Sequence, residues 1–315
     1  MDRRGVVKAV VTAPAGARLV TMSGEAGPAV EAGTGTSTKE APRMPFVATR
    51  DGTNLFCKDW GTGEPVVFVH GGQLGADMWE YQMTPLADAG LRCIAYDRRG
   101  CGRSSQPWHG YDADTLADDL ATVIERLDLR KITLVGHSNG GGDIARYLAR
   151  HGAGRVARVV LIGSTTPFML KTEDNPNGLD HRVFDETVAA ISEDRPRFFA
   201  AGASPFFGIS LPNGVVSPEM VQWLVGLALQ ASPRATVAMT RTFAATDFRP
   251  DMASFTVPTL VIHGAGDTFA PLDLCGRATA QAIPESRLAV YETGHGLFIT
   301  EQDRLNRDLL AFIAA

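Results

Sequence analysis

The stretch ITLVGHSNG, residues 132–140, decides the fold of this chain. Its apolar start, residues 132–135, predicts a buried strand, and a helical pattern opens near Gly142. Between them stands the pattern G-x-S-x-G, in which Gly136 and Gly140 let the backbone turn sharply around a serine. A glycine-rich loop would need neither the strand before it nor the helix after it. The pattern therefore predicts that Ser138 is a nucleophile at a strained strand-to-helix turn.

Short apolar runs like the one before Ser138 recur along the chain. They lie at residues 65–69, 91–96, 132–135, 159–162, 260–262 and 288–291, and helical patterns lie between or after them at residues 84–89, 113–127, 143–151 and 304–313. Continuous apolar runs are typical of strands that are covered on both faces. Strands that alternate with helices predict an α/β fold with a mostly parallel sheet. Residues 47–60 also predict a hairpin around the turn Asp51-Gly52.

The alternation stops between about residues 165 and 255. This stretch has no strand-like run, and it carries aromatic and methionine residues at helical spacing: Phe198, Phe199, Phe206, Phe207, Trp223, Met239 and Phe243. It is too long for a loop. We therefore expect one α/β domain, residues 45–315, with a helical cap at about residues 165–255 that folds over the edge of the sheet.

The first 44 residues differ in composition from the rest. Arg3-Arg4 and a short apolar stretch, residues 9–17, resemble a twin-arginine export signal with a cleavage site at residues 30–32. Arg18 interrupts the apolar stretch, however, and residues 23–44 lack hydrophobic periodicity, which is typical of a disordered tail. Both interpretations stay open, so we expect the protein to be either cytoplasmic or exported.

A serine nucleophile needs a base to take its proton and an acid to orient that base. Asp267 lies in a glycine-rich turn directly after the apolar run at 260–262, and His295 follows the last apolar run. Both come after Ser138 in the order serine, acid, histidine that G-x-S-x-G proteins use. His263 and His137 are weaker candidates because one ends a strand and the other lies inside the turn. We predict Ser138, Asp267 and His295 as the catalytic groups.

The negative charge that develops on the substrate needs two backbone N–H donors. Asn139, the residue after the nucleophile, supplies one. The loop His70-Gly71-Gly72-Gln73 follows another strand and supplies the second, for which Gly72 is the candidate and Gly71 the alternative. His70 either orders this loop by hydrogen bonds or touches substrate. Residues 97–104 (DRRGCGRS) predict a structural turn with a charge network beneath the site.

The composition indicates which kinds of molecule the protein is expected to bind. Of 315 residues, 44% are hydrophobic and 21% charged, and the formal net charge is −5. The basic residues form no run, which argues against nucleic acid, and no apolar window reaches the roughly 18 residues of a membrane span. The four cysteines lack metal-binding spacing, so we expect buried or half-buried free thiols and no metal: Cys57, Cys93, Cys101 and Cys275. The expected partner is a small-molecule substrate.

Together these motifs resemble those of the α/β-hydrolases, in the branch of cofactor-free haloperoxidases and esterases. The likeness runs from about Pro45 to the C-terminus, and its most specific segments are residues 97–108 (DRRGCGRSSQPW), 169–176 (MLKTEDNP) and 294–297 (GHGL). The resemblance implies the α/β-hydrolase fold, an acyl ester on Ser138, and no metal or organic cofactor. Water then releases the acyl group. In some relatives hydrogen peroxide takes it instead, and the resulting peracid oxidises halides. Relatives often form homo-oligomers.

Two positions depart from the pattern of this branch. Relatives usually carry Trp or Phe after the His-Gly pair and, in good peroxide users, Pro after that, where this chain has Gly72 and Gln73. The residue after the serine is usually Met and is Asn139 here. The expected result is a roomier and more polar acyl pocket, which favours hydrolysis over peroxide chemistry. Gln73, His70 and Phe168 are the candidate pocket residues.

The leading hypothesis is therefore a hydrolase of carboxylic esters or lactones. Its alternative is a haloperoxidase-like perhydrolase that makes peracids from a carboxylate and hydrogen peroxide. Carbon–carbon bond hydrolysis can use the same three groups, and a non-catalytic ligand receptor can share the fold. A dehalogenase or an epoxide hydrolase is excluded because those enzymes carry an aspartate at the position of Ser138.

Overall fold

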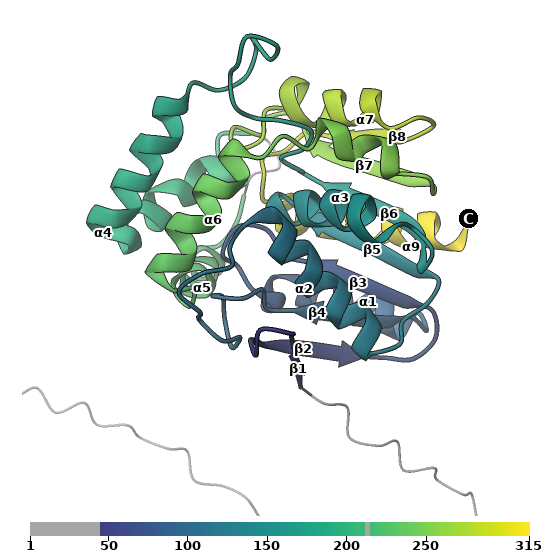
Figure 1. The fold of residues 1–315 in the computed structure, drawn as a ribbon. Coiled ribbons are helices and arrows are strands. Elements are labelled where there is room, and N and C mark those ends of the chain that lie inside the picture. Colours follow the sequence, from purple (N-terminus) through teal and green to yellow (C-terminus); the bar gives the residue numbers. More distant parts are fainter. Residues whose placement is uncertain (1–44, 212–214) are drawn as a thin grey trace, which may run out of the picture. The chain divides into compact units, whose positions relative to one another are not determined.

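A computed structural model of the chain describes residues 45–211 and 215–315 (Figure 1). The prediction for residues 1–44, a disordered tail or an export signal, lies outside these residues. The described part contains an eight-stranded sheet in the order β1-β2-β4-β3-β5-β6-β7-β8. Its strands are β1 (Phe46–Ala48), β2 (Asn54–Trp60), β3 (Pro65–Val69), β4 (Arg92–Tyr96), β5 (Ile132–His137), β6 (Val156–Ile162), β7 (Thr259–Gly264) and β8 (Arg287–Tyr291).

Strands β3 to β8 run parallel to one another, and β2 joins β4 antiparallel. The predicted hairpin is present, because β1 pairs antiparallel with β2 and Val47 lies opposite Leu55. The prediction of a mostly parallel sheet is confirmed. Since parallel strands point the same way, the loops after β3, β5, β7 and β8 all leave the same edge of the sheet. Those loops carry the predicted site residues.

Helices cover both faces of this sheet. α2 (Ala113–Arg126) and α3 (Asn139–His151) share an apolar core with Val67 and Val69 of β3. α1 (Glu80–Asp88) and α9 (Gln302–Ala314) share a second core with Val66 and Phe68 of the same strand. Successive side chains of a strand point to opposite faces. One continuous apolar run therefore supplies both cores, as the sequence pattern indicated.

The chain between β6 and β7 forms a helical cap. It consists of α4 (His181–Phe207), α5 (Pro218–Leu229) and α6 (Pro233–Ala245), followed by the 3₁₀ helix η2 (Arg249–Ser254). Figure 1 shows α4, α5 and α6 grouped at one side of the sheet. α4 bends at Asp194, whose backbone is non-helical (φ −150°, ψ 83°), next to the turn that contains Pro196. A proline inside a helix removes a backbone hydrogen bond and favours such a bend.

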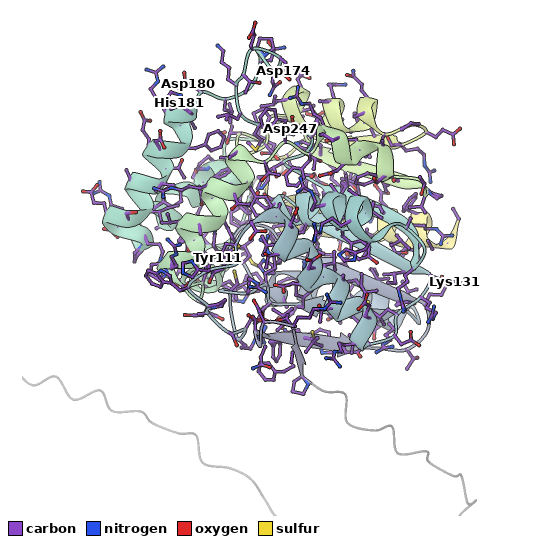
Figure 2. The ribbon with its side chains drawn as sticks, in the orientation of Figure 1. Tyr111, Lys131, Asp174, Asp180, His181 and Asp247 are labelled. Atoms are coloured by element: carbon purple, nitrogen blue, oxygen red, sulfur yellow. The ribbon has the colours of Figure 1, made fainter. Side chains whose placement is uncertain are left out.

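Arg249 ties the two ends of the cap together. Its guanidinium binds Asp174, in the loop before α4, at 2.8 Å and Asp247, in the segment after α6, at 2.6 Å. Figure 2 labels both aspartates. The same guanidinium lies 4.9 Å from the centre of the Phe168 ring. These contacts join the first and last segments of the insertion.

Two helices begin at least three residues earlier than the sequence predicts. α3 begins at Asn139 instead of near Gly142, and α1 at Glu80 instead of Thr84. Glycine disfavours a helix, so a run of glycines moves a predicted start downstream. In α3 close packing outweighs that preference: a Cβ at Gly141 would lie 2.1 Å from Oγ of Ser164. The remaining short helices are η1 (Ala76–Trp79), η3 (Asp273–Arg277), α7 (Ala278–Ala282) and α8 (Leu297–Thr300).

The cysteines are free and buried, as predicted: Cys57, Cys93, Cys101 and Cys275. Within residues 45–211 and 215–315, no helix has the length and apolar character that crossing a membrane requires.

Candidate active site

Ser138 stands between the last residue of β5 and the first residue of α3. Its backbone adopts φ 52° and ψ −122°, a conformation that non-glycine residues rarely hold. Its N–H donates to the carbonyl of Ile162 (2.9 Å), which fixes the turn to β6. Gly140 has to be a glycine, because a Cβ there would lie 2.4 Å from the carbonyl oxygen of Val69. The strained turn predicted from G-x-S-x-G is therefore present in the structure.

His295 and Asp267 meet at the same edge of the sheet. Asp267 follows β7, His295 follows β8, and Nδ1 of His295 lies 2.6 Å from Oδ2 of Asp267. The other carboxyl oxygen, Oδ1, accepts the backbone N–H groups of Phe269 (2.9 Å) and Ala270 (2.8 Å). His295 shares one cavity with Ser138. The structure thus brings the three residues predicted to be catalytic to one place.

The charge state of Asp267 fixes the tautomer of His295. Burial by itself would raise the pKa of Asp267, but the electrostatic interaction and the hydrogen bond with His295 outweigh burial and hold that pKa below the ordinary value. An ionised carboxylate only accepts hydrogen bonds, so Nδ1 of His295 carries the proton that it donates. Nε2 is then free to accept a proton on the other side of the ring.

Two further histidines, His137 and His263, support this pair, although the sequence does not predict a role for either in catalysis. His137 donates from Nε2 to the carbonyl of His295 (3.0 Å), and its ring centre lies 4.7 Å from that of His295. His263 donates from Nε2 to the carbonyl of Ala270 (2.6 Å) and lies 3.5 Å from Oδ2 of Asp267. Burial lowers the pKa of His137 to about 3 and also lowers that of His263. Both are neutral hydrogen-bond donors that position the backbone around the pair.

Aromatic rings enclose the imidazole of His295. Phe269 stacks on it with ring centres 5.5 Å apart, and Phe206 of the cap meets it edge-on at 5.3 Å. Phe269 follows Asp267 by two residues in the sequence. An aromatic residue so close to the predicted acid is the one signal that could have indicated this contact.

The two predicted backbone donors differ in how the structure holds them. Asn139 is the first residue of α3, so its N–H is one of the helix N-terminal groups that lack an intrahelical partner. Gly72 has φ +45°, a left-handed backbone that suits glycine. Gly71, the alternative, donates its N–H to Sδ of Met78 (3.4 Å) and is therefore engaged. This contact favours Gly72, as the sequence analysis preferred.

A cavity of about 1100 Å³ lies over Ser138. We call one side of it the sheet wall, made of residues 71–74, 137–139 and His295. The other side, the cap wall, is made of residues of α4, α5 and α6 together with Met169 and Leu179. Gln73 and Asn139 line the sheet wall as predicted, and Oδ1 of Asn139 accepts a hydrogen bond from Thr165 (3.3 Å). The cap wall is lined mainly by Phe, Leu, Ile, Val and Ala side chains, but it also carries the charged residues Glu193, Asp194 and Arg197 of α4.

Two predicted pocket residues do not line the cavity. Nε2 of His70 accepts the backbone N–H of Arg98 (3.0 Å), and its Nδ1 lies 3.3 Å from the carbonyl of Gly71. His70 therefore orders the loop and is buried away from the cavity. Phe168 packs beneath Arg249, and its neighbour Met169 reaches the cavity in its place. Adjacent residues in an irregular segment point in different directions, so sequence position alone selects the wrong one.

Known proteins share this arrangement. The sequence profile of the α/β-hydrolase fold family matches residues 64–207. The chain is 43% identical over 273 residues to a non-heme chloroperoxidase of Kitasatospora aureofaciens, and the match covers 86% of this chain and 99% of that protein. It is 40% identical over 276 residues to a bifunctional esterase/perhydrolase of Acinetobacter calcoaceticus, and that match covers 86% of this chain and 99% of that protein.

A solved structure gives the same result. The crystal structure of a bromoperoxidase from Bacillus anthracis superposes with a TM-score of 0.83 at 38% identity, and the match covers 86% of this chain and 99% of that one. The chain therefore belongs to the α/β-hydrolase family, in the branch that contains non-heme haloperoxidases and esterases.

Proposed function

We propose that the protein hydrolyses carboxylic esters or lactones through an acyl ester on Ser138. The observation that carries the proposal is the turn that holds Ser138, together with the His295–Asp267 pair. Ser138 is held in a strained turn at the floor of a large cavity that His295 also lines, and His295 is hydrogen-bonded to an ionised Asp267. A neutral imidazole with a free Nε2 is the base that a serine hydroxyl needs.

In this proposal Oγ of Ser138 attacks the carbonyl carbon while Nε2 of His295 takes the hydroxyl proton. The backbone N–H groups of Asn139 and Gly72 bind the oxyanion that forms on the carbonyl oxygen. His295 then returns the proton to the departing alcohol oxygen, which leaves the acyl group on Ser138. A water molecule attacks this ester with His295 again as the base, and the carboxylic acid leaves as Ser138 recovers its proton.

Perhydrolysis is the second candidate, and the relatives favour it. Proteins about 40% identical to this chain bear the names non-heme chloroperoxidase and bifunctional esterase/perhydrolase. Hydrogen peroxide would replace water in the second half of the reaction and leave with the acyl group as a peracid. Gly72 and Gln73 stand where the branch usually has an aromatic residue and, in good peroxide users, a proline, so hydrolysis is our first proposal.

The test of the first proposal is turnover of a short-chain p-nitrophenyl ester. We expect Ser138→Ala to lose at least about a hundredfold in kcat, because the three groups act as a unit. The matched control is Ser164→Ala, which removes another buried hydroxyl, one bonded to Thr166. A Ser138→Ala enzyme that keeps most of its rate would show that another group is the nucleophile.

The same preparation separates the two candidates. Bromide oxidation that requires both acetate and hydrogen peroxide, and that Ser138→Ala abolishes, is the signature of perhydrolysis. We expect ester hydrolysis to be much faster than acetate-dependent bromination. The opposite ranking would make perhydrolysis the main activity.

A further inference from the structure

A buried ion pair joins the two segments that carry the proposed oxyanion donors. Arg98, in the loop after β4, and Asp143, in α3, are almost fully buried, and Nη1 of Arg98 lies 3.1 Å from Oδ2 of Asp143. The proposed reaction uses neither side chain. Buried ion pairs are seldom more stabilising than apolar side chains of the same size. The role of this pair therefore follows from the backbone segments that it holds in place.

Arg98 makes its second bond to the oxyanion loop. Its Nη2 donates to the carbonyl oxygen of Gly72 at 2.5 Å, and its own backbone N–H donates to Nε2 of His70. Glycine has the greatest backbone freedom of any residue, and Gly72 adopts a left-handed conformation. A hydrogen bond to its carbonyl restrains the rotation that would swing its peptide groups. Arg98 is thus bonded to both His70 and Gly72.

Asp143 makes the connection to the other donor. It lies four residues after Asn139 in α3, on the same side of the helix. A helix is rigid over one turn, so fixing Asp143 fixes the helix end that carries the Asn139 N–H. The guanidinium of Arg98 is planar and rigid. Its Nη2 binds the carbonyl of Gly72, and its Nη1 binds the carboxylate of Asp143 in α3. The distance between Gly72 and α3 is therefore set by one rigid group.

We propose that Arg98 and Asp143 are positioning residues that set the spacing of the Gly72 and Asn139 backbone donors. The inference rests on the proposed function. It implies that loss of the pair lowers kcat while substrate binding is largely kept, since the misplaced donors act on charge that exists only in the transition state.

The test replaces the pair without leaving a buried charge. The double variant Arg98→Met/Asp143→Leu exchanges two charged side chains for apolar ones of similar size, which folded proteins often tolerate. The matched control is Arg99→Met/Asp119→Leu. Arg99 and Asp119 are also a buried pair, joined by bonds of 2.6 and 2.7 Å, and they contact none of the proposed donors.

We expect Arg98→Met/Asp143→Leu to lose about 30- to 100-fold in kcat, because a donor misplaced by roughly 1 Å has an effect of that order. KM should change less than about threefold, and affinity for phenylboronic acid, which forms a tetrahedral adduct on a serine, should fall in proportion to kcat. The control pair should keep kcat within about threefold of the wild type. Thermal unfolding of each variant verifies that it is folded.

Ser138→Ala in the same series separates the two claims. If Ser138→Ala is inactive while the folded Arg98→Met/Asp143→Leu enzyme keeps kcat within threefold, the positioning role is wrong and the proposed function stands. An equal loss in the control pair would also overturn the positioning role, because any buried pair would then have the same effect. If Ser138→Ala remains active, the proposed function fails and the inference fails with it.

Discussion

The sheet wall and the cap wall of the cavity differ in how their residues are held. On the sheet wall, hydrogen bonds fix the backbone of Ser138 and the Asp267–His295 pair behind it. The cap wall presents apolar side chains such as Phe198, Leu224 and Val225, which make no side-chain hydrogen bonds. Directional bonds specify positions closely, whereas apolar contacts specify volume. We infer that the sheet wall determines the reaction and that the cap wall determines which substrates fit.

The largest expected effect comes from Asp267, which lies behind the sheet wall, in the variant Asp267→Asn. Oδ1 of Asp267 accepts two backbone N–H groups, so the amide oxygen of an asparagine would take that side and its NH₂ would face His295. Nδ1 of His295 would then have to accept, and Nε2 would carry the proton and could not take one from Ser138. We expect kcat to fall by about 10,000-fold.

The control for that variant is Asp251→Asn. Asp251 binds Nε of Arg146 at 2.9 Å and does not line the cavity, so its loss should leave kcat within about twofold. Steady-state kinetics on the same ester measure both variants. A loss of less than tenfold in a folded Asp267→Asn enzyme would contradict the tautomer argument.

The next effect concerns stability against pH. His70, His137 and His263 are buried beside the sheet wall, and burial lowers the pKa of each below that of an unfolded chain. Below about pH 6.5 the unfolded chain therefore binds protons that the folded chain does not, and stability falls as the pH falls. Asp143 acts in the opposite sense, because burial raises its pKa to about 6.

Burial also raises the pKa of Asp119. The three histidines outnumber the two aspartates, so we expect net proton uptake on unfolding and a stability that slopes downward from pH 7 to pH 5. Urea unfolding at pH 7, 6 and 5 measures this slope. Stability that stays level or rises from pH 7 to pH 5 would contradict the prediction.

The smallest expected effect is on the cap wall. Val225 of α5 lines the cavity, so Val225→Trp should narrow it without touching the sheet wall. We expect kcat/KM for a p-nitrophenyl octanoate to fall about tenfold and that for the acetate to stay within about threefold, since steric exclusion acts on the longer acyl chain. Gln222→Trp places the same side chain on the exposed side of α5 and is the control. Equal losses for both esters would mean that the cap wall does not select by length.

The sequence predicts the fold and the three central residues because each lies at a recognisable place. Continuous apolar runs mark buried strands, and Ser138, Asp267 and His295 each follow one of them in a fixed order. The contacts of His137 and Arg98 cannot be predicted because they join segments far apart in the chain. Those of His263 with Ala270 and Asp267 are local, but they depend on the backbone path of the turn after β7. Phe168 is misplaced because, in irregular segments, the direction of a side chain depends on local backbone angles that composition does not determine. His70 orders its loop, which is one of the two alternatives that the sequence leaves open.

Covalent labelling tests the central claim, that Ser138 is the nucleophile, most directly. The protein would be treated with a p-nitrophenyl alkylphosphonate, which stops at a stable adduct on an activated serine, and the modified peptide would be identified by mass spectrometry. The account predicts one phosphonate per chain, located on Ser138, with loss of activity in step with labelling and no labelling of Ser138→Ala or Asp267→Asn on the same timescale. A label on another residue, or full activity in the labelled protein, would contradict it.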